Sequence, residues 1–472
     1  MITRSLGAEQ YGIYNFLKIF YDNIIRFFDV GTLAFYPKLS RRPGNQGIIR
    51  FVVLYDVILF SATLIMLVLL FISGQAESVL TTKSLTIASS IFLLSWILII
   101  NQKMSFFMDA QGKTITNEVV SIITRIIFTT GLVVLFTYNR LNLITFLILQ
   151  NTIFLVALFF LLIIAFNFFP LDKKSSSIKN TAYEFKDFSL PLFWSSTITI
   201  VTLLGDRWLL QVLGGTAAQG HYSLGLNLSA ICMLLTGSMA PLLTREYAIA
   251  YEKNDKTRLV HLYSTFIPLF YVITAVIACF LAVHGDWFAP LIGGADFHEA
   301  ALPVTLIGLS TIHQTYGQLS GELMSATDRT RELGGIAIFI TILGLPFTYF
   351  FLAPQEYWGL DLGASGLAIK LLILQITSVN IQLWFNTRYL NIGITYFIAH
   401  QVLVLILFPF VAFIGKFIVG YKLGSGIIAL IASGGLYLFL VFTILLLFPG
   451  LIAMEREEFL NHITKPSKFF KS

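Results

Sequence analysis

The chain has 472 residues, of which 56% are hydrophobic and only 12% are charged. Soluble domains carry about 25% charged residues, so this composition excludes an ordinary cytosolic or secreted fold. The two cysteines, Cys232 and Cys279, lie in apolar runs, which excludes a disulfide framework and a cysteine-based metal site. The formal net charge of +6 would suit a nucleic-acid partner, but the distribution of the basic residues favours membrane orientation instead. The sequence therefore predicts an all-α polytopic membrane protein with no nucleic-acid partner.

Apolar segments recur along the chain at the length that a membrane-spanning helix needs, about 20 residues. We predict thirteen spans, at 11–36, 49–73, 85–107, 117–137, 143–168, 189–213, 217–243, 259–283, 300–324, 333–353, 363–387, 395–419 and 425–450. The sharpest break in composition is the Lys- and Ser-rich segment 170–188, which we interpret as a cytoplasmic linker. We accordingly expect an N-terminal bundle at 1–169, a C-terminal bundle at 189–390, an extra helix pair at 391–450 and a cytoplasmic tail at 451–472.

The basic residues of the predicted loops are distributed unequally between the two sides of the membrane. One alternating set of loops carries 21 Lys and Arg residues, Lys103 among them, and the other set carries only 4. Because cytoplasmic loops are enriched in Lys and Arg, the first set is predicted to face the cytoplasm. This orientation places the C-terminus in the cytoplasm and Met1 outside.

An internal repeat relates the two halves of the chain. The motif Gly7-x4-Gly12-Ile13-Tyr14 returns 208 residues later as Gly215-x4-Gly220-His221-Tyr222. Two further pairs of segments recur in the same order and on the same predicted side, 37–41 with 241–245 and 110–114 with 326–330. Both copies run in the same direction, which indicates a parallel repeat about an axis along the membrane normal.

The repeat also predicts that a helix is missing. A helix at 189–213 precedes the second copy, and its counterpart would lie upstream of Met1. We therefore expect a complete protein of fourteen helices, arranged as two six-helix bundles and a C-terminal pair. The alternative is a true thirteen-helix protein with an external N-terminus.

Ionisable residues inside the predicted spans are candidates for function, because each costs about 2.5–3.5 kcal/mol at the bilayer centre and so faces protein or water. The candidate set is Lys18, Asp22, Arg26, Asp29, Asp56, Arg125, Asp206, Arg207 and Lys370. The first four of these residues are separated by four, four and three positions, which places them on one face of a helix. Our interpretation is that these residues line one central polar cavity.

Most of these residues also have a structural explanation. The stripe from Lys18 to Asp29 could be an ion-pair ladder that only lets the helix pack, although buried ladders contribute little stability for their desolvation cost. Arg125 and Lys370 could extend toward an interface, and Asp206 with Arg207 could form a self-contained pair. The histidines of the spans, such as His313, are expected to be packing residues, since the chain has only seven His and no His cluster.

Sequence signals of an enzyme are missing. The chain contains no His-x-x-x-His or Cys-x-x-Cys metal spacing, no Walker lysine motif and no GxSxG elbow. The largest predicted outer loop, 284–299, is a small cap. We therefore expect a transporter that is not an enzyme and that uses neither cofactor nor metal.

Three sets of residues carry motifs that occur together in a known family. The segment Arg4-Ser5-Leu6-Gly7-Ala8-Glu9-Gln10-Tyr11-Gly12-Ile13-Tyr14 has the pattern R-x-LG-x-x-x-YG-x-Y. Leu204–Leu210 contains a D-R pair and is followed by G-x-Y-S at Gly220–Ser223, and Gly363–Ala368 is a GA-x-G-x-A stretch. Together these motifs resemble those of the polysaccharide and O-antigen flippases, the Wzx-like family of the multidrug/oligosaccharidyl-lipid/polysaccharide exporter superfamily. The resemblance covers nearly the whole chain.

The resemblance implies a bacterial-type plasma-membrane flippase that works by alternating access between two six-helix bundles. Its cavity would bind a polyprenyl-diphosphate-linked oligosaccharide and leave the lipid tail in the bilayer. The bases that could hold the diphosphate are Lys18, Arg26, Arg125, Arg207 and Lys370. The acids that could position those bases or couple ions are Asp22, Asp29, Asp56 and Asp206. Membrane lipids, a polysaccharide polymerase and chain-length machinery are the expected partners, and the missing first helix is the departure from the family.

Two other functions stay open at this stage. An ion-coupled drug exporter of the same superfamily would need a small acidic coupling site, which Asp22, Asp29 and Asp56 could supply. The many intramembrane bases argue against a cationic drug. A membrane glycan polymerase or ligase would need an active site on the outer face and would make glycan chains in vitro.

Overall fold

The computed structural model describes residues 1–29, 46–110, 112–168, 178–424 and 426–453. Every regular element among these residues is a helix, so the predicted all-α fold is confirmed. The chain divides into two compact units, Met1–Gly220 and His221–Ser472. The predicted bundle boundaries at 169 and 189 stay a prediction. We describe each unit by itself.

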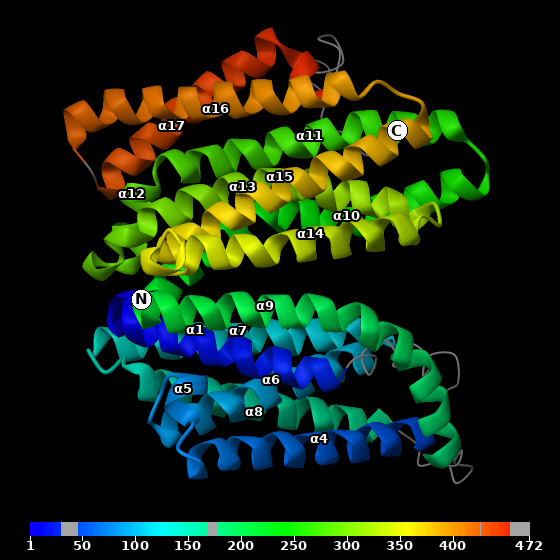
Figure 1. Cartoon of the computed structure of the whole chain (residues 1–472), viewed down its shortest axis with the longest axis vertical. Helices are drawn as coiled ribbons and strands as arrows, with labels where there is room; N and C mark the ends of the chain where they lie inside the picture. Colours follow the sequence, from blue (N-terminus) through cyan, green and yellow to red (C-terminus); the bar gives the residue numbers. More distant parts are fainter. Residues whose placement is uncertain (30–45, 111, 169–177, 425, 454–472) are drawn as a thin grey trace. The chain divides into compact units, whose positions relative to one another are not determined.

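The first unit is built around one apolar helix. Its helices are α1 (Ile2–Phe28), α4 (Gln46–Ile72), α5 (Ala76–Leu80), α6 (Leu85–Ala110), α7 (Thr114–Thr137), α8 (Leu143–Phe168) and the first part of α9 (Ile178–Ser229) (Figure 1). Helix α6 packs against α1 and α8, and its side chains Ile91, Leu94 and Trp96 are buried. Trp96 donates a hydrogen bond to the Thr63 hydroxyl of α4 at 3.2 Å, which satisfies its indole N–H.

The predicted linker 170–188 is helical where the structure describes it, because α9 begins at Ile178. Phe185 of α9 belongs to a hydrophobic cluster with Val52 of α4 and Phe107 of α6. The start of α9 is therefore part of the packed first unit.

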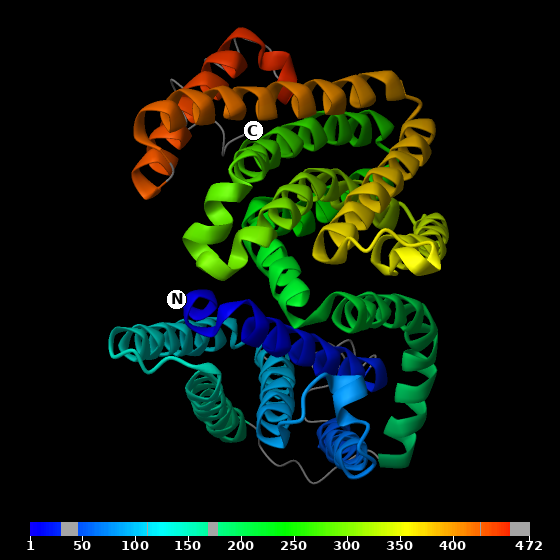
Figure 2. The same cartoon turned by 60° about the vertical axis from the view of Figure 1, so that its left-hand side comes forward.

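The second unit is built around α13 (Ala301–Ala326), which packs against α10 (Leu234–Glu252), α11 (Lys256–Val283) and α15 (Gly363–Leu390). The other elements are η1 (Ala230–Met233), α12 (Gly285–Phe288), η2 (Ala289–Gly293), η3 (Ala295–Ala300), α14 (Thr330–Leu352), η4 (Gln355–Tyr357), α16 (Ile394–Leu423), α17 (Ile427–Leu447) and η5 (Pro449–Ile452). Helices α16 and α17 pack on each other, and α16 runs along α11 (Figure 2). The predicted outer cap 284–299 folds into α12, η2 and η3.

Ten described helical segments are long and apolar enough to cross a membrane, against the thirteen spans predicted. Two of the thirteen, at 11–36 and 300–324, fall on α1 and α13, which are not among the ten. Two more, at 189–213 and 217–243, overlap a single segment of the ten, Ile200–Glu252, in which Gly215 has non-helical backbone angles between the two predicted spans. Helix α1 carries charges and α13 is rich in Ser, Thr and Gln, so their polar faces need protein rather than lipid around them. The count of thirteen stays a prediction.

The repeat is visible in the backbone of α1 and α9. Gly7 has φ 70° and ψ 174°, and Gly215, its counterpart 208 residues later, has φ 82° and ψ 177°. This region of backbone space is accessible to glycine almost alone. The two copies therefore bend in the same way at the same place, as the parallel repeat predicts.

The two bent segments also contact each other through glycine. A methyl group added at Gly12 would overlap the carbonyl oxygen of Thr216, and one added at Gly220 would overlap the carbonyl oxygen of Ala8. Thr216 and Gly220 are the repeat counterparts of Ala8 and Gly12, so the contact is reciprocal. We call it the glycine crossing, and it brings the α1 and α9 backbones side by side (Figure 1).

Replacing Gly12 or Gly220 by Ala should destabilise the protein, because the new methyl group would meet backbone atoms that cannot rotate away. We expect a loss of about 1–3 kcal/mol or more, typical of overpacked sites, measured as a lower thermal unfolding midpoint in detergent. Gly205→Ala on α9 is the matched control, since no atom lies within 4 Å of its added methyl group. If Gly12→Ala unfolds at the same temperature as Gly205→Ala, the crossing does not hold the two segments together.

Candidate functional site

The charged stripe of α1 does not form one continuous ladder. Lys18 pairs with Asp22 at 2.6 Å, and the side chains of both are mostly buried. The second oxygen of Asp22, Oδ1, is buried and has no hydrogen-bond partner among the described residues. Further along the helix, Arg26 and Asp29 bind side chains of α6 instead of extending this pair.

Two carboxylates of the first unit share one lysine. Lys103 of α6 lies 2.7 Å from Asp29 Oδ1 and 2.5 Å from Asp56 Oδ1. The side chains of Lys103 and Asp29 are 2% and 4% exposed, and that of Asp56 on α4 is 17% exposed. We call these three residues the acid–lysine triad; it joins α1, α4 and α6 inside the unit and carries a formal charge of −1.

The position of Asp29 explains why it needs this lysine. Asp29 is the C-cap residue of α1, where the helix dipole places negative charge and disfavours a carboxylate. Lys103 provides the compensating cation. When the basic residues of the predicted loops were counted, Lys103 was wrongly assigned to a cytoplasmic loop. It lies inside the predicted span 85–107, and this position was the sequence signal that could have placed it within the helix.

A polar cavity of about 350 Å³ lies among α6, α7 and α8. Its polar lining consists of Asn101, Gln102, Ser105, Asn117, Ser121, Thr124 and Arg125. Arg26 of α1 donates to Gln102 Oε1 at 2.8 Å, which connects the charged helix to the cavity wall.

Arg125 is the exposed cation of this cavity. Among the described residues it makes no hydrogen bond and no ion pair. The neighbouring amides are already engaged, since Asn117 donates to Ser105 at 2.6 Å and Asn101 donates to the Phe154 carbonyl at 3.1 Å. The cavity thus combines oriented amides and hydroxyls with one guanidinium whose donors are available.

An apolar cavity of about 400 Å³ adjoins the polar one between α7 and α8. The two share Val120, Thr124 and Ala157 as lining residues. The rest of the apolar wall includes Ile123, Ile127, Ile153, Val156, Phe160 and Ile164. Polar and hydrocarbon surfaces therefore meet at one place, as an amphiphilic ligand requires.

The remaining candidates lie elsewhere. Arg207 of α9 is buried and Asp206 beside it is half-buried. Lys370 belongs to the second unit, where it is buried between α14 and α15 and donates to the Thr348 hydroxyl at 2.6 Å. The small residue Gly344 permits this position, because a methyl group there would lie 3.2 Å from Lys370 Cε. A binding or coupling role for each candidate stays a prediction.

The second unit buries polar groups that the sequence analysis did not single out. The hydroxyls of Thr236, Thr274 and Thr315 lie 2.9–3.3 Å from one another, and all three residues are buried. His313 is buried with its ring 6.0 Å from that of Tyr271, and its Nδ1 has no partner among the described residues. The part of the chain that the structure describes contains no group of three or more His, Cys, Asp or Glu that could hold a metal ion.

Comparison with known proteins gives a family and a fold. A model of the family described as polysaccharide biosynthesis protein matches residues 1–245. Among curated proteins, none matches the chain.

Two solved structures share the fold over most of their length. The lipid II flippase MurJ in an inward closed conformation aligns with a TM-score of 0.70 and 12% identity, over 96% of each chain. An inward-facing multidrug resistance MATE family transporter of the MOP superfamily aligns with a TM-score of 0.67 and 12% identity, over 83% of this chain and 92% of that one. The chain thus has the helical fold of these membrane transporters, as the sequence predicted.

Replacing Lys103 by Gln should strongly destabilise the protein, because it leaves two buried carboxylates without their cation. We expect a loss of about 3–5 kcal/mol, measured by thermal unfolding in detergent. The triple change Lys103→Gln, Asp29→Asn and Asp56→Asn should recover much of that loss. Lys83→Gln removes a cation from an exposed pair with Glu77 and should change stability by less than about 1 kcal/mol. A triple variant as unstable as Lys103→Gln alone would contradict this account of the triad.

Proposed function

The chain belongs to the polysaccharide biosynthesis protein family, and from this premise we propose that it is a flippase for a lipid-linked polysaccharide precursor. The substrate is an oligosaccharide joined by a diphosphate to a polyprenyl chain, and it moves from the inner to the outer leaflet of a plasma membrane. No bond is made or broken. The C-terminus lies in the cytoplasm, as the distribution of basic residues indicates.

The observation that carries the proposal is the polar cavity with Arg125. A guanidinium with available donors can bind a diphosphate through two parallel hydrogen bonds, the strongest geometry for this pair. The side-chain oxygens of Asn101, Ser105 and Asn117 can accept hydrogen bonds from the hydroxyl groups of a sugar, while the amide N–H groups keep their partners within the protein. A ligand with both chemical groups therefore finds matching partners on the same cavity wall.

The adjoining apolar cavity supports a lipid-linked substrate in particular. Its aliphatic and aromatic walls can accept the first isoprene units beyond the diphosphate, while the rest of the chain stays in the bilayer. A free sugar phosphate would leave this surface without a partner.

The other bases contribute in different ways in this proposal. Arg26 reaches the cavity through Gln102, and Lys18, held by Asp22, lies about two turns earlier on α1. Arg207 and Lys370 contact the diphosphate at other stages of the transport cycle. Asp206 positions Arg207, and the acid–lysine triad takes part in ion coupling through Asp29 and Asp56.

The glycine crossing holds α1 against α9 inside the first unit, and in the predicted orientation it lies on the outer side. Polymerase and chain-length proteins would receive the precursor on the outer side.

An ion-coupled multidrug exporter is the second candidate, and one observation favours it. The triad places two carboxylates around one lysine, an excess of acid that could bind a proton or a metal cation during coupling. In a strain that lacks the gene, normal surface glycan together with raised drug sensitivity would support the exporter. Loss of surface glycan without a change in drug sensitivity would support the flippase.

Arg125→Gln should abolish transport without lowering protein levels, because an exposed side chain that has no partner among the described residues contributes little to stability. The measurement uses proteoliposomes that contain a fluorescent polyprenyl-diphosphate oligosaccharide and follows its access from outside. We expect at least a tenfold lower rate, with partial recovery in Arg125→Lys, which keeps the charge but not the bidentate geometry.

Two further variants make this test specific. Arg140→Gln removes an exposed arginine that follows α7 outside the cavity, so its transport rate should equal that of the wild type. Arg26→Gln should slow transport, because it removes the link to Gln102. Unaltered transport in a protein with both Arg26→Gln and Arg125→Gln would overturn the assignment of the site.

A further inference from the structure

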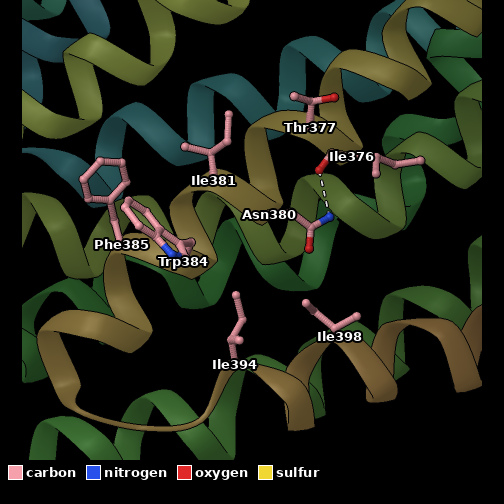
Figure 3. A pocket seen from close by; sticks show the side chains of 8 residues that line it. All are labelled: Ile376, Thr377, Asn380, Ile381, Trp384, Phe385, Ile394 and Ile398. Atoms are coloured by element: carbon pink, nitrogen blue, oxygen red, sulfur yellow. Dashed lines mark hydrogen bonds between the residues drawn. The ribbon is translucent and has the colours of Figure 1, made fainter.

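A groove of about 650 Å³ opens between α15 and α16 of the second unit (Figure 3). Its walls are formed mainly by Ile376, Ile381, Trp384, Phe385, Ile394 and Ile398. Trp384 and Ile398 are each 43% exposed, and Figure 3 shows these side chains on both sides of the open space. The groove is therefore an accessible hydrocarbon surface at the corner where α15 turns into α16.

The two polar side chains in the groove are already engaged. Asn380 donates to the Ile376 carbonyl at 2.9 Å (Figure 3) and accepts a hydrogen bond from Gln401 of α16 at 3.5 Å. Thr377 donates to the Ile373 carbonyl at 2.8 Å. Because both side chains already have partners within the protein, the groove does not require a polar ligand along its length. An extended acyl chain matches such a surface.

A cation lies at one end of the groove. The Arg388 guanidinium, one helical turn after Trp384, sits 4.6 Å from the centre of the Trp384 ring. Arg388 is exposed, and among the described residues its guanidinium makes no hydrogen bond or ion pair besides this ring contact. By contrast, the nearby Arg329 pairs with Glu332 and donates to Asn386 Oδ1 at 3.0 Å. Arg388 is thus the arginine with donors available at this corner.

The charges around this end favour an anion. The residues that line the groove are uncharged, and so are the residues of the first turn of α16, Ile394 to Phe397. A tryptophan with an arginine stacked on it is typical of the membrane interface, where the ring lies among headgroups and the cation reaches phosphate. The predicted orientation places Arg388 on the cytoplasmic side, where anionic lipids attract basic residues.

We propose that the α15–α16 groove binds an anionic phospholipid of the inner leaflet. One acyl chain lies along the isoleucine and aromatic side chains, and the Arg388 guanidinium donates hydrogen bonds to the phosphate. The lipid contacts both helices across the Asn391–Gly393 turn and so stabilises the α16–α17 pair on the rest of the second unit. This site is separate from the Arg125 cavity, and its test does not depend on transport.

The experiment measures lipid retained by the purified full chain in native mass spectrometry, with phosphatidylglycerol and phosphatidylcholine supplied in equal amounts. The wild type should retain phosphatidylglycerol preferentially. Arg388→Gln should lower its affinity roughly tenfold, the loss expected for one charge-assisted contact to phosphate. Arg331→Gln is the matched control, because it removes the same charge from an exposed position on α14.

A second variant tests the groove independently of the charge. Ile398→Trp would fill the space between α15 and α16, and it should lower retention of phosphatidylglycerol while leaving Arg388 in place. The proposal is overturned if Arg331→Gln loses as much lipid as Arg388→Gln, or if phosphatidylcholine is retained equally well. Displacement of phosphatidylglycerol by an equal amount of polyprenyl phosphate would also overturn it, since the groove would then be a path for the substrate tail.

Discussion

The close approach of two backbones at the glycine crossing is the constraint on which the packing of α1 against α9 in the first unit depends. Gly12 and Gly220 occupy equivalent places in the repeats, and each lies against the backbone of the other copy. The bends at Gly7 and Gly215 direct the chain into this contact. A methyl group at either glycine would overlap a carbonyl oxygen of the other segment, so only glycine permits this contact.

Two sets of charges in the first unit have different roles in our account. The triad of Asp29, Asp56 and Lys103 is buried and joins three helices, so its members compensate one another's desolvation. Arg125 is exposed in a polar cavity and makes no polar contact within the described part of the chain. The first group holds the unit together, and the second can bind an anionic ligand. In our account, transport requires that the charges of the structural triad and the ligand-binding charge of Arg125 stay separate.

The features that could be predicted from the sequence are those that periodicity or repetition encodes. The offset of 208 residues between Gly7 and Gly215 predicted a shared structure, and the backbone angles at both positions agree. The residues with which the charged side chains pair were not predictable in the same way. The spacing of α1 suggested one stripe, yet Arg26 and Asp29 bind α6, because their partners depend on how helices distant in sequence pack. Lys103 was missed because a base near the end of a span resembles a loop residue.

The most direct test of the central claim is the leaflet in which the lipid-linked precursor accumulates when the protein is depleted from its source organism. A membrane-impermeant reagent that modifies the exposed glycan measures this in intact cells and spheroplasts. We predict that the precursor becomes trapped on the cytoplasmic leaflet, and that restoring the protein returns it to the outer leaflet. Precursor that reaches the outer leaflet at the normal rate, whether or not it is then joined into chains, would contradict a flippase.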